Sequence, residues 1–160
     1  MLEINLVPRS CWYKTGVRDK LSPDEWIQIV DATARRANFQ CEFCGFDGYL
    51  VCHPDFQKRI HLDNWATYLL TGFSLVCQNC CDAIHIGRAQ KVSPERFREV
   101  KEHIKNVNKL DKDSEVEFMV FKAFSKYRSE ALYRWEVDIW SYLQDLGFTP
   151  NLMVDTKTRG

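Results

Sequence analysis

The sequence predicts an α+β fold in which helices flank a cysteine-rich centre and a small β-sheet joins the two ends. Two observations support this prediction. Amphipathic segments that open with capping residues alternate with short strand-like segments along the 160-residue chain, and six of the seven cysteines lie between positions 41 and 81. A chain of this length forms one domain. We predict that it covers residues 1–148, with a core at 22–92, a helical extension at 93–133, a closing strand at 134–140 and a flexible tail at 149–160.

Composition excludes several classes of protein. Apolar residues make up 45% of the chain and aromatic residues 13%, which is too many for a disordered segment. No run approaches the roughly 18 apolar residues of a membrane span, and the start lacks a secretory signal. We therefore expect a cytoplasmic protein without membrane insertion. The 22 basic and 22 acidic residues give a formal net charge of zero, so bulk charge alone does not hold this chain to nucleic acid.

Three helix starts stand out. Ser22 is followed by a proline and by Glu25, which is a capping box, and an apolar stripe then runs to about residue 37. Ser93 precedes a second proline and a second stripe. Ser114, with Glu117 three residues later, opens a third helix rich in phenylalanine.

Strand signals are fewer. Residues 2–6 and 135–139 alternate between apolar and polar side chains, so we expect them to pair and to join the two ends of the chain. Residues 49–52 form a short apolar stretch that is typical of a strand. Residues 53–72 are ambiguous, and within them residues 65–70 are apolar enough for either a short helix or a strand.

Two Cys-x-x-Cys pairs, Cys41 with Cys44 and Cys77 with Cys80, predict one zinc site. Tetrahedral zinc takes four soft ligands, and two such turns supply two thiolates each. The order strand, cysteine turn and helix is that of a treble clef. The odd number of cysteines and the absence of a secretory signal disfavour disulfides. The other alternative to a zinc site is four buried cysteines without a metal ion. If zinc is bound, the adjacent Cys81 is an alternative to Cys80 as the fourth ligand. A site closed by four thiolates is structural.

The same residues resemble the HNH endonuclease superfamily. The motifs are Cys41-x-x-Cys44-Gly45, Cys52-His53 and Cys77-x-x-Cys80 followed by His85. More narrowly, the chain resembles small bacterial and phage HNH-like proteins of the treble-clef, ββα-metal type. This resemblance covers most of residues 5–143 and implies metal-dependent hydrolysis of a phosphodiester. It makes His53 the general base and His85 a ligand of a catalytic divalent ion, Mg²⁺ or another.

The chain departs from that group at three places. His53 is followed by Pro54, where the group has His-Glu, and the second pair reads Cys80-Cys81, where it has Cys-His. No asparagine occupies the middle position just before the second pair, where Phe73 and Ser74 stand, and Asn64 is the nearest one. One acidic ligand and one histidine of the catalytic ion are therefore missing. The acids that are candidates to compensate are Asp55, Asp63 and Asp82.

Basic residues gather after His85. Residues 85–110 hold seven lysines and arginines and three glutamates, a charge that suits the DNA backbone. The residues nearest the predicted site are Arg88, Lys91, Arg96 and Arg98. The alternative is an ordinary solvated helix face.

Two functions fit these features. The first is an HNH-like nuclease whose activity on DNA is weak or lost. The second is a non-catalytic zinc scaffold or adaptor that binds a protein partner, for example in a secretion or phage assembly, with the aromatic-rich residues 118–142 as the contact surface. The HNH-like adaptor of type IVB secretion coupling complexes is a precedent for the second. Sequence-specific DNA binding without cleavage has no recognition helix to support it.

Overall fold

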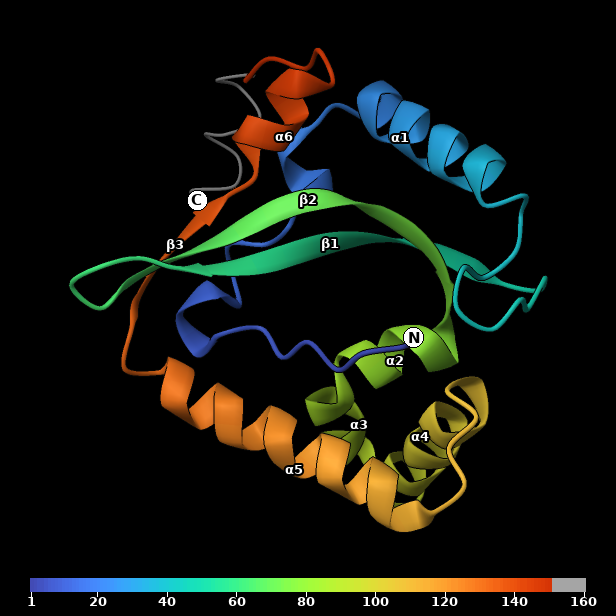
Figure 1. Ribbon diagram of the computed structural model, residues 1–160. Coiled ribbons are helices and arrows are strands. Elements are labelled where there is room, and N and C mark those ends of the chain that lie inside the picture. The colour runs from blue at the N-terminus through green and yellow to red at the C-terminus, as the bar shows by residue number, and fades with distance from the viewer. Residues whose placement is uncertain (151–160) are drawn as a thin grey trace. The chain divides into compact units, whose positions relative to one another are not determined.

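The computed structural model describes residues 1–150, and within them helices and strands are mixed as the α+β prediction requires (Figure 1). Residues 151–160 of the predicted tail lie outside the described residues. No helix among the described residues is long and apolar enough to cross a membrane. The elements are two short 3-10 turns at Arg9–Cys11 and Arg18–Lys20, helices α1 (Pro23–Arg36), α2 (Gln78–Ile84), α3 (Ile86–Val92), α4 (Pro94–Val107), α5 (Asp113–Glu130) and α6 (Trp140–Asp145), and strands β1 (Leu50–Ile60), β2 (Trp65–Cys77) and β3 (Arg134–Asp138).

Two compact units make up the chain, and both are built from separate segments. The first unit contains residues 1–8, 40–51 and 75–132. The second contains residues 9–39 and 52–74 and resumes at residue 133. Two of the boundaries fall inside β1 and β2, so each of these strands contributes residues to both units.

The first unit is helical, with α2 and α3 packed against α4 and α4 packed against α5 (Figure 1). Its core contains fully buried aliphatic residues from these helices, such as Ile86, Val100 and Ile104. The predicted cap of α4 is confirmed, since Ser93 Oγ accepts a hydrogen bond from Arg96 N at 3.0 Å. The predicted start of α5 at Ser114 is slightly late. The carboxylate of Glu115 accepts hydrogen bonds from the backbone N–H groups of Asp111 and Lys112, and the helix starts at Asp113.

The N-terminal segment is an extended arm in this unit, so the predicted pairing of residues 2–6 with 135–139 is wrong. Residues 2–6 are not a strand. Asn5 N donates to Ile84 O at 2.9 Å, and Leu2 is only 1% exposed within the helical core. The alternating pattern is therefore explained by an extended chain that buries one side against helices, which has the same two-residue period as a strand.

Asn108 fixes this arm to the end of α4. Its Oδ1 accepts from Leu2 N at 2.8 Å, and its Nδ2 donates to Leu2 O at 2.9 Å. We expect Asn108→Ala to lower the free energy of unfolding by about 1–3 kcal/mol, because two backbone groups of a buried segment lose their partner. Urea unfolding checks this, with the exposed Asn106→Ala as the control. Equal urea midpoints for Asn108→Ala and Asn106→Ala would contradict this prediction.

The second unit holds β3 and most of β1 and β2, and the three strands form one sheet in the order β1-β2-β3. Residues 53–72, which the sequence left between strand and helix, belong mostly to β1 and β2. Asp63 and Asn64 turn the chain between these strands with positive φ angles of 62° and 58°. The predicted strand at 135–139 is confirmed as β3, but it pairs in parallel with β2, from Trp65 opposite Arg134 to Leu69 opposite Asp138.

Helix α1 belongs to the same unit and confirms its predicted start. Ser22 Oγ accepts from Glu25 N at 3.2 Å, while Glu25 Oε1 accepts from Ser22 N at 2.9 Å. At the other end of α1, Arg36 Nη2 donates to Phe73 O on β2 at 2.6 Å. Trp26 packs edge-on against the Phe73 ring. These contacts attach α1 to the sheet.

Candidate functional site

The four cysteines of the two Cys-x-x-Cys pairs converge in the first unit. The sulfurs of Cys41, Cys44, Cys77 and Cys80 all lie within 4.8 Å of one another, and three of these residues are buried while Cys44 is exposed. The group contains Cys80, not the adjacent Cys81. Four sulfurs at this spacing could hold a metal ion such as zinc.

A tight turn presents the first pair. Gly45 N donates to Cys41 O at 2.9 Å, and Cys41 N donates to Phe46 O at 2.8 Å. Gly45 has a φ of +80°, a backbone conformation that residues with a Cβ rarely adopt. The sequence Cys-x-x-Cys-Gly therefore folds locally into a turn that places both sulfurs on one side.

A helix start presents the second pair. Cys77 caps α2, since its Sγ accepts from Cys80 N at 3.4 Å. The Cys77 sulfur lies 3.6 Å from the Cys44 sulfur of the first pair. Glu42 connects the two turns: its backbone N donates to Leu75 O at 2.9 Å, and its Oε2 accepts from Leu75 N at 2.6 Å.

The thiols of this cluster have shifted pKa values. Burial is the main reason that the pKa of Cys44 rises from 9.0 to about 11, with the sulfurs of Cys77 and Cys41 adding to the rise. Burial and the nearby Cys41 and Cys77 also raise the pKa of Cys80. Burial acts against ionisation of Cys41 too, but backbone N–H donors, first that of Cys44, outweigh it and lower its pKa to about 7. A divalent cation is the partner that would let all four ionise together, so the donor set fits zinc.

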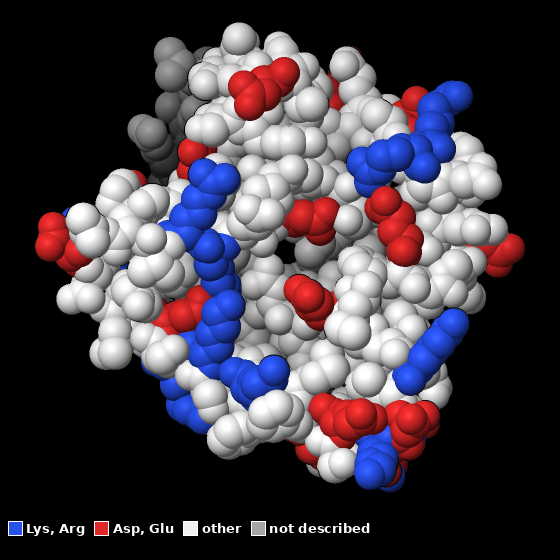
Figure 2. Space-filling view, viewed as in Figure 1, with Lys and Arg blue, Asp and Glu red and all other residues white. Residues whose placement is uncertain are grey.

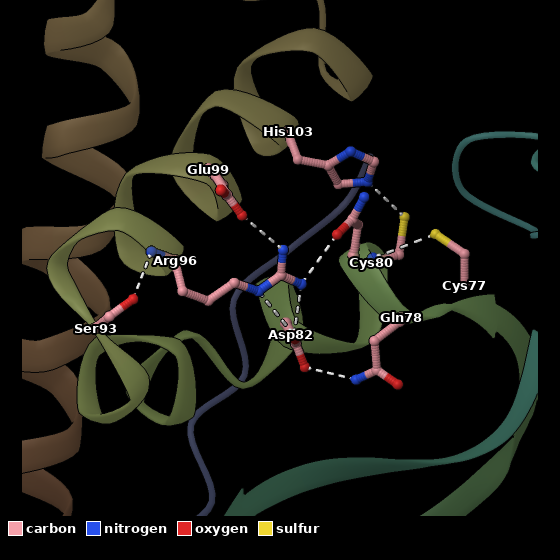
Figure 3. Close-up of polar contacts among 9 residues, drawn as sticks. Cys77, Gln78, Cys80, Asp82, Ser93, Arg96, Glu99 and His103 are labelled. Carbon is pink, nitrogen blue, oxygen red and sulfur yellow. Dashed lines mark hydrogen bonds and ion pairs between the residues drawn. The ribbon is translucent and has the colours of Figure 1, made fainter.

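A histidine from α4 also contacts this cluster. His103 Nε2 on α4 lies 3.1 Å from Cys80 Sγ (Figure 3). Burial, and secondly the charge of Arg96, lower the pKa of His103, which favours the neutral form of its ring. Sequence gave no signal for this contact, because it depends on how α4 packs against α2.

Arg96 occupies the centre of a polar network beside the cysteines (Figure 3). Its guanidinium donates to Asp82 at 2.6 and 3.2 Å, to Asn79 at 2.9 Å and to Glu99 at 3.3 Å. The hydrogen bond to Asp82 is the main cause of a raised pKa for Arg96. Sequence proposed this arginine as a DNA contact. That role stays a prediction, and the observed role is to tie α4 to α2, which carries Cys80.

The other predicted DNA contacts are exposed, with Arg88 and Lys91 on α3 and Arg98 on α4. Further along α4, Lys101 pairs with Glu117 at 2.7 Å and Lys105 with Asp113 at 2.8 Å. Figure 2 shows acidic and basic side chains side by side at the lower right, where α4 and the start of α5 lie in Figure 1. The positive charge counted over residues 85–110 is thus reduced by acids on α5.

The two predicted catalytic histidines lie in different units. His85 belongs to the first unit, where it directly follows α2, and its backbone N donates to Cys81 O at 3.1 Å. Helix α2 therefore ends at Ile84, just before His85. His53 belongs to the second unit, on β1. Their joint action at one divalent ion stays a prediction.

His53 contacts a carboxylate. His53 is 9% exposed, and its Nδ1 lies 3.1 Å from Asp55 Oδ1. Asp55 Oδ2 accepts from Ser74 Oγ at 2.5 Å. Of the acids that sequence offered as compensation, Asp82 is bonded to Arg96 and Asp63 lies in the loop between β1 and β2.

Comparisons with protein-family models, curated proteins and solved structures found no match for this chain. The resemblance to HNH endonucleases therefore depends on the motifs alone.

Proposed function

We propose that this protein is a zinc-organised, HNH-like phosphodiesterase with weak activity on DNA. The observation that carries the proposal is the order of elements around the cysteine cluster. A first cysteine turn leads into β1, which carries His53; β2 follows; and the second cysteine turn opens α2, which ends at His85. The HNH resemblance implies two strands and a helix, with one histidine on the first strand and another on the helix. Here the second histidine, His85, directly follows the last residue of α2.

The proposed reaction is hydrolysis of one phosphodiester bond. His53 takes a proton from water, the water oxygen forms a bond to phosphorus, and the P–O bond to the leaving oxygen breaks. The leaving oxygen then takes a proton from solvent. A divalent ion held with the help of His85 would supply charge stabilisation at the phosphate. The missing acidic and imidazole ligands weaken that ion, which is why we expect low activity.

A plasmid-nicking assay with magnesium, manganese and nickel tests this function. We expect slow cleavage by the zinc-loaded parent and a loss of about 10²–10⁴-fold in His53→Ala, the range by which a general base accelerates such steps. His61→Ala is the matched control, since His61 lies at the end of the same hairpin and bonds to Thr67 at 2.8 Å. Equal cleavage by the parent and His53→Ala would remove His53 from the mechanism.

A second candidate is a non-catalytic zinc scaffold that binds a protein. It is favoured by two large apolar side chains on α5, Phe118 and Phe121, which are 58% and 64% exposed. They lie one helical turn apart, so they are neighbours on the surface of that helix. The nicking assay separates the two candidates. Protein that retains zinc, keeps its fold and cleaves with none of the three metals would favour the scaffold.

A further inference from the structure

We propose that Asp55 is the positioning residue of His53, held in place by Ser74. This inference rests on the proposed function in one respect only, namely that His53 acts as a base. The hydrogen bonds that carry it all lie within the second unit.

The strand itself brings the two side chains together. His53 and Asp55 are two residues apart on β1, and residues at i and i+2 of a strand share one face. Pro54 between them directs its ring to the opposite face. The sequence His-Pro-Asp, a departure from the HNH pattern, thereby places a carboxylate next to the imidazole on the same strand.

The carboxylate has a defined orientation. Its Oδ1 lies 3.1 Å from His53 Nδ1, and its Oδ2 accepts from Ser74 Oγ on β2 at 2.5 Å. The backbone carbonyl of Asp55 also accepts from Thr71 Oγ1 at 3.3 Å. Both carboxylate oxygens are therefore engaged, and the contacts from β2 fix the side chain that contacts His53.

An ionised carboxylate only accepts hydrogen bonds, so Nδ1 must be the protonated nitrogen of a neutral His53 ring. The lone pair then lies on Nε2, which is the nitrogen that takes the proton from water in the proposed step. The imidazolium that results is stabilised by the same carboxylate. An oriented base of this kind is a recurring element of hydrolytic sites.

Asp55 could instead replace the missing acidic ligand of the divalent ion, and kinetics distinguishes the two roles. A positioning residue changes kcat while the metal concentration for half-maximal cleavage stays the same. A ligand changes that metal concentration. We expect Asp55→Asn to lower kcat by about 10–100-fold without a change in metal requirement. Ser74→Ala, which leaves the Asp55–His53 contact in place, should lower kcat less than Asp55→Asn.

A tautomer measurement makes the inference independent of activity. The chain has four histidines, so ¹⁵N-labelled ring signals can be assigned with His53→Ala in the full-length, zinc-loaded protein. We expect His53 to be the Nδ1–H tautomer in the parent and a mixture of tautomers in Asp55→Asn. Asp55→Asn with an unchanged tautomer would overturn the inference, as would a raised metal requirement. If no variant cleaves DNA, the proposed function fails, while the tautomer result still decides the role of Asp55.

Discussion

Cys44→Ser is expected to release the metal ion and unfold the first unit. The four sulfurs lie within 4.8 Å of one another, and burial together with neighbouring sulfurs opposes ionisation of Cys44 and Cys80 when no cation is present. A structural zinc site contributes on the order of 10 kcal/mol to folding, which is comparable to the whole stability of a domain. A serine hydroxyl is a poor replacement, because zinc binds the thiolate.

Cys81→Ser is the matched control for this experiment. Cys81 is next to Cys80 in sequence but does not belong to the four-sulfur group. We expect elemental analysis to find one zinc per chain in the parent and in Cys81→Ser, and none in Cys44→Ser. Circular dichroism should show loss of helix only in the last of these. A metal-free Cys44→Ser protein that keeps its helices would rule out a structural role for the ion.

Arg96→Met is expected to destabilise the first unit by about 2–4 kcal/mol. The guanidinium joins α4 to Asp82 and Asn79 on α2. The side chains of Arg96 and Asp82 are only 23% and 21% exposed, so both are partly shielded from water. Removing the arginine leaves a half-buried carboxylate without its cation, which costs more than the hydrogen bonds alone. Methionine keeps much of the side-chain volume, so the loss reports mainly on polar contacts.

Arg98→Met on the same helix is the control for Arg96→Met. Arg98 is exposed, so this change should leave the free energy of unfolding within about 0.5 kcal/mol of the parent value. A double-mutant cycle with Asp82→Asn then isolates the Arg96–Asp82 interaction. Additive effects would show that the ion pair does not connect α4 to α2.

Local sequence signals predicted the elements that depend on nearby residues. The capping serines of α1 and α4 were identified because a cap bonds to a residue three positions away. The cysteine turns were identified because the spacing within each pair determines the local geometry. Strand β3 was found from its alternation, although that alternation does not specify which strand it joins.

Features that depend on distant residues could not be predicted in this way. The N-terminal arm alternates like a strand, but its hydrogen-bond partners are Ile84, the last residue of α2, and Asn108, which directly follows α4. His103 and Arg96 reach the cysteine region only because α4 packs against α2. Asp55 was named from sequence as a candidate ion ligand, and its contact with Ser74 depends on how β1 pairs with β2.

The interleaving of the two units has a consequence for protein synthesis. The chain passes from one unit to the other five times, between residues 8 and 9, 39 and 40, 51 and 52, 74 and 75, and 132 and 133. Neither unit is a continuous stretch that a ribosome could release and let fold while the other is still being made. Cys41 and Cys44 therefore leave the ribosome before α2, which carries Cys80, has been made. The arm that starts the chain must wait for Asn108 before Leu2 has its hydrogen-bond partner.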